Sequence, residues 1–210
     1  MEVDLAIGWM RATADAVAAS SEELTRLDAA IGDGDHGVNL TRGFAAVAAA
    51  LDAGSFAGVG EVFVTAGSTL ISKVGGASGP LYGSALRSLG KALPPGAPVT
   101  ASDLAAGLHA GLEAVRKLGG AEPGDKTIVD AWKPAADAFE AAVAAGAGLP
   151  EAAGEAARAA REGARATTDL RARKGRASYL GERSAGHQDP GATSTALLFR
   201  ALSEQAGNSG

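Results

Sequence analysis

The sequence predicts an all-α protein, on three observations. Hydrophobic residues make up 46% of the 210 residues, but they are largely alanine, and aromatic residues make up only 4%. Alanine is the strongest helix former, whereas sheets are built mainly from β-branched and aromatic side chains. Apolar residues also recur at intervals of three and four, which is the period of one helix face. Finally, no linker and no internal repeat divide the chain, so we expect residues 1–210 to form a single domain of about eight helices.

Composition also excludes several functional classes. The formal net charge of −5 gives no basic footprint for binding nucleic acid. Cysteine is absent, which excludes disulfides and thiol chemistry. The first residues lack the basic and apolar regions of a signal peptide, and no apolar run reaches 18 residues. We therefore expect a cytoplasmic protein with neither a membrane nor a nucleic-acid partner.

The individual helices follow from apolar spacing, capping residues and breaks. Ser20 or Ser21 can cap a short second helix, while Pro80, Thr100 and Pro150 mark later helix starts. Glycine-rich or proline-rich segments separate the apolar stripes. We expect helices over about residues 4–20, 21–28, 38–51, 59–74, 80–92, 101–118, 128–143, 150–170 and 196–202.

Some features inside this pattern have ordinary structural interpretations. Pro134 should kink or restart the helix in which it lies. His109 lies beside an apolar stripe and is expected to be a solvated helix histidine. The segment 119–127 is superficially like a phosphate-binding P-loop, but Asp125 stands where that motif needs lysine and the preceding segment is helical, so this interpretation fails. The basic residues of segment 171–183 are expected to be solvated or to face a bound phosphate.

The segment from Leu27 to Asn39 concentrates acidic groups where the helical pattern pauses. Asp28 ends one predicted helix, and Asp33 and Asp35 are separated by one glycine, so their carboxylates point to the same side of an extended segment. Converging carboxylates without cysteine favour a hard cation such as Mg²⁺, which in proteins usually accompanies phosphate. The bland alternative is a capped loop in which the carboxylates bond nearby backbone amides.

Two motif interpretations of the same segment fail. Glycines at 32, 34 and 37 fit the dinucleotide-binding spacing, but no strand precedes them. A calcium-binding EF-hand loop would need Asp or Asn at position 37 and Glu at position 44, where the chain has Gly37 and Phe44.

Four polar, glycine-rich segments follow alternate helices, near residues 28–39, 75–79, 119–127 and 175–191. In an up-and-down antiparallel arrangement, such segments lie at the same end. One rim then gathers carboxylates, backbone amides near helix starts, the Ser78 hydroxyl and an arginine. This inventory is typical of a phosphoryl-transfer site.

These segments resemble the L-type, nucleotide-binding subunits of dihydroxyacetone kinase over nearly the full chain. The motifs that carry the resemblance are Leu27-Asp28 with Gly32-Asp33-Gly34-Asp35-His36-Gly37, Gly75-Gly76-Ala77-Ser78-Gly79-Pro80-Leu81-Tyr82-Gly83, Pro123-Gly124-Asp125-Lys126-Thr127, and Gly175 to Arg183 continuing through Gly186 to Ser194. The resemblance implies a closed barrel of eight antiparallel helices, with ADP or ATP and two Mg²⁺ ions at one rim.

The resemblance also implies roles for particular residues. The metal ligands fall on Asp28, Asp33 and Asp35, and the phosphate-facing, catalytic arginine falls on Arg176. The implied nucleotide contacts are His36, Gly37, Val38, Asn39, Ala77, Ser78, Gly119, Ile128, Asp189, Pro190 and Gly191.

The resemblance further implies partners on other chains. A K-type subunit holds dihydroxyacetone covalently on a histidine, and an M-type phosphocarrier of the phosphotransferase system can recharge bound ADP in place. The motifs leave open whether ADP stays bound or ATP exchanges freely. Two further hypotheses remain: a kinase for another ketose or for an acyl acceptor, and a nucleotide-sensing protein that binds a transcriptional regulator without turnover.

Overall fold

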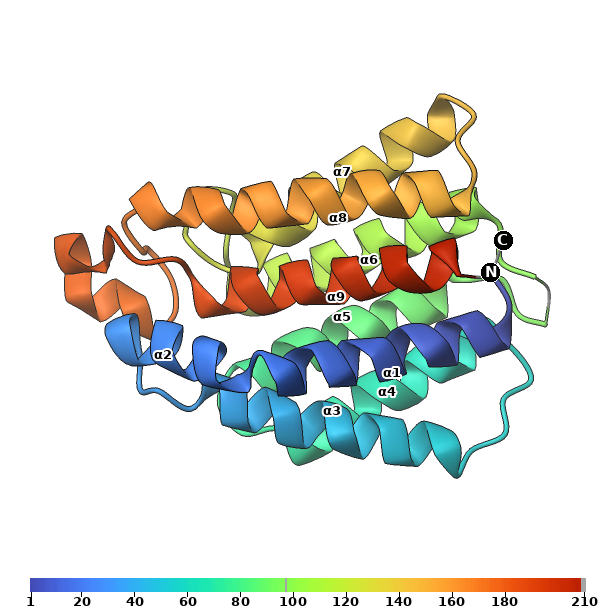
Figure 1. Ribbon diagram of the computed structural model, residues 1–210, viewed down its shortest axis with the longest axis horizontal. Helices are drawn as coiled ribbons and strands as arrows, with labels where there is room; N and C mark the ends of the chain where they lie inside the picture. Colours follow the sequence, from blue (N-terminus) through green and yellow to red (C-terminus); the bar gives the residue numbers. More distant parts are fainter. Residues whose placement is uncertain (97, 209–210) are drawn as a thin grey trace.

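Helices that run back and forth along the long axis build the whole of the described chain, residues 1–96 and 98–208 of a computed structural model (Figure 1). The α-helices are α1 Val3–Ala19, α2 Ser21–Ile31, α3 His36–Asp52, α4 Val59–Lys73, α5 Ser78–Ala92, α6 Ala101–Gly119, α7 Val129–Ala144, α8 Leu149–Ala166 and α9 Pro190–Gly207. Two 3₁₀ segments, η1 Thr167–Asp169 and η2 Arg176–Ser184, lie between α8 and α9. The predicted all-α class is confirmed.

The helices form a ring in which each packs against the next. α1 packs on α3, the chain then proceeds through α4, α5, α6, α7 and α8 to α9, and α9 packs back on α1. The short helix α2 extends beyond the ring at the end where η2 also lies (Figure 1). Eight helices therefore close the ring, and α2 forms part of one rim.

Small residues let the helices approach closely, and a few aromatic pairs fill the centre. On α8, the buried residues are all alanine: Ala152, Ala153, Ala156, Ala160 and Ala164. Edge-to-face pairs join Trp9 to Phe63, Phe44 to Tyr82 and Trp132 to Phe199, with ring centroids 5.2–6.3 Å apart. This explains how a chain with so few aromatic residues builds one continuous core.

The helix containing Pro134 does not restart there, contrary to one of the two expected outcomes. α7 continues from Val129 to Ala144, and Pro134 has no N–H to donate to the carbonyl of Asp130. Gly163 of α8 packs at that turn, where a Cβ atom would lie 2.2 Å from the Asp130 carbonyl oxygen. The neighbouring helix thus accommodates the proline within a continuous helix.

The predicted end of the 150–170 helix was four residues too late. α8 ends at Ala166 and is followed by η1, after which the basic segment folds into η2. Ala172, Ala177 and Leu180 pack against Ile31 at the end of α2. This small apolar cluster holds the basic segment beside the acidic loop. Among the residues that the structure describes, no helix is both long and apolar enough to cross a membrane.

Candidate functional site

All four polar segments predicted to share one rim line a single cavity of about 270 Å³. They connect α2 to α3, α4 to α5, α6 to α7, and α8 to α9, and they meet at the end of the ring where α2 and η2 lie (Figure 1). The prediction that alternate loops converge is confirmed. The cavity has an acidic wall on one side and an apolar wall on the other.

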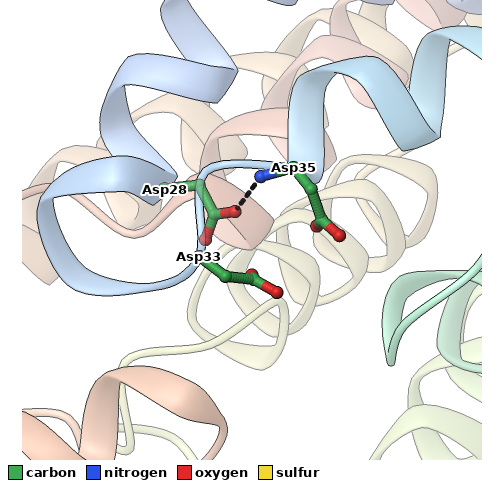
Figure 2. Close-up of side chains that lie close together, drawn as sticks. All are labelled: Asp28, Asp33 and Asp35. Carbon is green, nitrogen blue, oxygen red and sulfur yellow. Dashed lines mark hydrogen bonds between the residues drawn. The ribbon is translucent and has the colours of Figure 1, made fainter.

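The acidic wall consists of Asp28, Asp33 and Asp35. Each offers one carboxylate oxygen within 4.8 Å of the others. Asp28 is buried in the last turn of α2, while Asp33 and Asp35 are exposed on the loop before α3 (Figure 2). Three carboxylates so close repel one another unless a cation lies between them, so this wall fits a hard divalent ion.

Asp28 also fixes the shape of the acidic loop. Its Oδ2 accepts hydrogen bonds from the backbone amides of Asp35 at 2.9 Å, drawn in Figure 2, and of His36 at 3.1 Å. A Cβ atom at Gly32 would lie only 2.2 Å from the other carboxylate oxygen, Oδ1, so the loop needs glycine there. The capped-loop interpretation is therefore correct for Oδ2, and Oδ1 remains available to a cation.

Four helices begin at this rim and point their N-terminal ends toward the cavity. His36 opens α3, Ser78 opens α5 and Pro190 opens α9, and all three line the cavity, as does Ile128 just before α7. Helix N-termini carry unpaired amides and a partial positive charge. The residues that precede α3 and α5, Asp35 and Ala77, make no side-chain cap hydrogen bond, and in α3 the His36 amide is already bonded to Asp28. Their amides are thus oriented to receive an anion beside the carboxylates.

A buried hydrogen-bond network locks three of these helix starts together. The His36 ring contacts the Ser78 hydroxyl through Nδ1 at 3.0 Å and the Ser194 hydroxyl through Nε2 at 2.9 Å. The Tyr82 hydroxyl then contacts Ser194 at 2.7 Å and Thr195 at 2.8 Å. Burial lowers the pKa of His36, although Asp28 and Asp35 act in the opposite direction. The neutral ring therefore holds the rim together and adds no charge to it.

Arg176 lies beside the acidic wall and lines the same cavity. Its Nη2 is 3.0 Å from Oδ2 of Asp33, and both side chains are at least one third exposed. Such an exposed pair is weak and exchanges readily with another partner. The structure thus brings the predicted arginine to the predicted carboxylates, where it can reach an anion held between them.

The apolar wall of the cavity combines bulky and small residues. It consists of Leu81, Val115, Gly119, Ala121, Ile128 and Pro190. The predicted positions Gly119 and Ile128 are among them, so they fall on the side suited to a planar heterocycle rather than to phosphate.

Asp189 closes this wall and is buried. Its Oδ2 accepts a hydrogen bond from the Ala192 amide at 2.7 Å, which caps α9. Burial raises its pKa to about 7, with nearby Asp130 also raising it and Lys126 lowering it. Asp189 therefore binds a proton more readily than an exposed aspartate.

The structure does not bring every predicted contact to the cavity. Gly37, Val38 and Asn39 lie in the first turn of α3 but do not line it. A Cβ atom at Gly37 would lie 2.1 Å from the Ser21 carbonyl oxygen, so this glycine permits α2 to contact α3. Val38 is 57% exposed, and Asn39 accepts a hydrogen bond from Arg42.

Sequence reasoning missed two groups at this rim. Tyr82 and Ser194 were inside quoted motifs but were given no role, because only the fold brings them together. Lys126 also lies inside a motif that carries the resemblance and has no role assigned to it there. Its side chain is 1% exposed, and a lysine in a tight glycine-containing loop was the only available signal.

Chemically, this cavity combines the parts needed to hold a nucleotide. The carboxylates suit a divalent cation, the helix starts and Arg176 suit phosphate, and the apolar wall suits a base.

Comparison with known proteins identifies the family of the chain. A family model described as the DAK2 domain matches residues 30–204. The ADP-binding subunit DhaL of PEP-dependent dihydroxyacetone kinase 1 from Listeria innocua is 44% identical over 199 residues, covering 95% of this chain and 94% of that protein. The corresponding DhaL subunit from Escherichia coli is 41% identical and covers 93% of both chains.

Longer kinases also match. The D-erythrulose kinase of Mycolicibacterium smegmatis is 44% identical across 92% of this chain. The crystal structure of the dihydroxyacetone kinase of C. freundii in complex with AMP-PNP and Mg²⁺ has a TM-score of 0.73 and 27% identity across 96% of this chain. The matched region is 34% of each of these kinases, so this chain spans about a third of their length. Because the family model matches most of the sequence and two relatives align with it from end to end, the chain belongs to the DAK2 domain family.

Proposed function

We propose that this protein is the ADP-binding subunit of a cytoplasmic dihydroxyacetone kinase. In this role it passes a phosphoryl group from bound nucleotide to a substrate held on a K-type subunit. The observation that carries the proposal is the single cavity in which Asp28, Asp33 and Asp35 face the starts of α3 and α5. The full-length similarity to DhaL subunits supports it.

The three carboxylates are the proposed ligands of two Mg²⁺ ions. Oδ1 of Asp28 faces the loop at Gly32, and Asp33 and Asp35 are exposed toward the cavity. Mg²⁺ prefers carboxylate oxygens and keeps several positions for water and phosphate. When bound, the ions neutralise the phosphates and the charge that develops during transfer.

The chain's own residues supply positioning and electrostatics. The amides at the starts of α3 and α5 orient the phosphates, with Ala77 and Ser78 beside them. Arg176 leaves Asp33 as a cation binds that carboxylate, and its guanidinium then contacts the transferring group. On the other wall, Gly119, Ile128 and Asp189 to Gly191 hold the base and ribose.

The acceptor and its base come from the partner. In the proposed transfer, the acceptor hydroxyl oxygen forms a bond to phosphorus, the bond to the leaving nucleotide oxygen breaks, and the hydroxyl proton passes to a base on the K-type subunit.

A rim of exposed apolar side chains supports docking of such a partner around the cavity. Among the described residues, the large hydrophobic side chains that are exposed to solvent are Val38, Ile71, Leu118 and Tyr179. They lie in the first turn of α3, near the ends of α4 and α6, and in η2, which all border this rim. A partner that reaches the cavity from this end of the ring would cover these side chains.

In the form that we favour, ADP stays bound and an M-type phosphocarrier recharges it. A phosphohistidine on the carrier then transfers its phosphoryl group to the terminal oxygen of ADP, and the histidine nitrogen is released. The names of the PEP-dependent relatives support this form over exchange of free ATP.

A second candidate differs only in the acceptor. The D-erythrulose kinase and L-erythrulose 1-kinase relatives, at 44% and 45% identity, favour a four-carbon ketose in place of dihydroxyacetone. The acceptor would again be held elsewhere, so the partner decides between the two. A regulator-binding protein without turnover is the remaining possibility, and it predicts nucleotide binding with no transfer to any partner.

Reconstitution tests the proposal. The purified chain is combined with a K-type subunit and either a phosphorylated M-type carrier or ATP, and product is measured with dihydroxyacetone and with erythrulose. We expect dihydroxyacetone phosphate, formed with the carrier and with no added nucleotide. Product formed only when ATP is added would show that free ATP exchanges into the site and that bound ADP is not recharged by the carrier. Erythrulose phosphate as the sole product would show that erythrulose, not dihydroxyacetone, is the acceptor. No product with any combination would refute the function.

A further inference from the structure

Lys126 is a buried cation whose role the proposed chemistry does not use. Its side chain is 1% exposed, and its ammonium donates to the backbone carbonyls of Thr167 at 2.7 Å, Leu170 at 3.0 Å and His187. The three N–H groups of an ammonium match these three acceptors. With its donors occupied in this way, the ammonium is directed at the protein backbone rather than at a ligand.

The three carbonyls belong to segments that build the cavity wall. Thr167 and Leu170 lie at the end of α8 and η1, and the chain then leads to Arg176. His187 lies two residues before Asp189, which caps α9. On its own loop, Lys126 is followed by Ile128 of the apolar wall. One ammonium therefore ties together the three stretches that carry the proposed arginine, ribose side and base contacts.

A second bond reinforces this junction. The Thr167 hydroxyl accepts a hydrogen bond from the Asp189 amide at 2.9 Å, so Thr167 is held through both its carbonyl and its hydroxyl. The cluster is buried and fully bonded, which is the condition under which a buried charge is tolerated.

The backbone at Lys126 is unfavourable for a lysine. Its φ is +63°, and within residues 1–96 and 98–208 every other residue with positive φ is glycine. A non-glycine residue in this region costs free energy and persists only where the surrounding structure holds it in place. The hydrogen bonds of the Lys126 ammonium therefore offset the cost of its positive φ.

We propose that Lys126 is a positioning residue for nucleotide binding. Its ammonium holds segments 167–170 and 187–191 against the α6–α7 loop, so that Arg176 and Asp189 face the cavity before the nucleotide arrives. The inference rests on the proposed nucleotide site and adds a residue that acts through the segments that its ammonium joins.

The test variant is Lys126→Gly, because glycine accepts the positive φ and removes the ammonium without adding strain. We expect native helix content and, by calorimetry on protein stripped of bound nucleotide, at least tenfold weaker binding of Mg²⁺–ADP. Amide hydrogen exchange should quicken over residues 167–190 and stay unchanged in α3, α4 and α5. The matched control is Lys133→Met, which removes an exposed lysine paired with Asp137 on α7 and should leave ADP affinity unchanged.

Chemical rescue separates positioning from general stability. Butylammonium has the length and charge of the missing side chain and should restore part of the ADP affinity to Lys126→Gly. Butanol, which has a similar shape but no charge, should not.

The outcomes are distinguishable. If the wild-type chain does not bind Mg²⁺–ADP, the proposed function fails. If the wild type binds and Lys126→Gly binds equally well, or if butanol rescues as well as butylammonium, the inference is overturned. If the glycine variant does not fold, the nearly isosteric Lys126→Met replaces it under the same expectation. Failure of both variants to fold would make Lys126 a general folding residue and would also overturn the inference.

Discussion

Asp189 is a buried carboxylate with a pKa raised to about 7, chiefly by burial. In the unfolded chain the same group ionises near its ordinary value of 3.8. The folded state therefore binds more protons between these values, and this contribution to stability is lost as pH rises from about 4 to about 7. The penalty at higher pH is on the order of 1 to 4 kcal/mol.

Asp189→Asn tests this assignment. Asparagine keeps an acceptor for the Ala192 amide at the start of α9 but cannot ionise. Relative to wild type, the variant should gain free energy of unfolding as pH rises from 4.5 to 7.5, and the difference should then level off. Urea unfolding in EDTA, without nucleotide, measures this. Parallel pH profiles for the two proteins would show that the carboxylate is not perturbed by burial.

Arg176 is exposed and pairs weakly with Asp33, so its removal should cost little stability. If its guanidinium contacts the group in transfer, Arg176→Ala should lower the rate of transfer by about 10²-fold or more and change ADP affinity by much less. Single-turnover transfer and ADP calorimetry measure the two effects separately. The neighbouring Arg171, paired with Glu182, provides the control as Arg171→Ala. A large loss of ADP affinity with normal turnover at saturation would contradict the assignment.

Helix starts, rather than single side chains, create the phosphate side of the cavity, and the hydroxyl of Tyr82 links two of them. This hydroxyl on α5 donates toward the Gly191 carbonyl at 3.0 Å and contacts Ser194 and Thr195 on α9. Tyr82→Phe leaves these buried groups with one partner fewer and should destabilise the fold by about 1 to 3 kcal/mol.

Urea unfolding of Tyr82→Phe against Tyr179→Phe checks this expectation. Tyr179 is 88% exposed, so its substitution should leave stability unchanged. Equal stability of the two variants would mean that the α5–α9 link contributes nothing.

Helix existence was predictable here because alanine content and apolar spacing agree along the chain. The residues at which the helices begin and end were less predictable. Pro134 does not interrupt α7, since Gly163 of α8 packs at that turn, and α8 ends earlier than predicted because Lys126 binds the carbonyls that follow it. Both depend on contacts between distant segments, which a local pattern does not contain.

Over the whole molecule, the arrangement of the site follows from topology. The return of the chain after every second helix brings Asp28, Ser78, Ile128 and Asp189 to one cavity, and the sequence order alone predicts this. The buried network of His36 and Tyr82 and the position of Lys126 were not predictable, because their partners lie 41 to 158 residues away along the chain. The roles of the site residues in binding metal and nucleotide stay predictions, which rest on the motifs and on the geometry of the cavity.

The exposed apolar side chains around this rim lead to a prediction about assembly. Leu118 and Tyr179 are 54% and 88% exposed, and η2 and the end of α6 border the cavity. The double variant Leu118→Ser, Tyr179→Ser should weaken binding of the K-type subunit about tenfold or more while ADP affinity stays unchanged. Surface plasmon resonance against that subunit measures this. Unchanged binding would place the partner on another face.

The central claim is that Asp28, Asp33 and Asp35 hold the cation through which this rim binds nucleotide. Calorimetric titration of ADP, with Mg²⁺ and with EDTA, into wild type and Asp33→Asn that have been stripped of bound nucleotide tests it most directly; Asp52→Asn, at an exposed carboxylate paired with Arg11, is the control. We predict tight binding that requires Mg²⁺ in the wild type and in the control, and binding at least tenfold weaker in Asp33→Asn with its helix content intact. ADP binding that is the same in EDTA, or unchanged Mg²⁺–ADP affinity in Asp33→Asn, would contradict the claim.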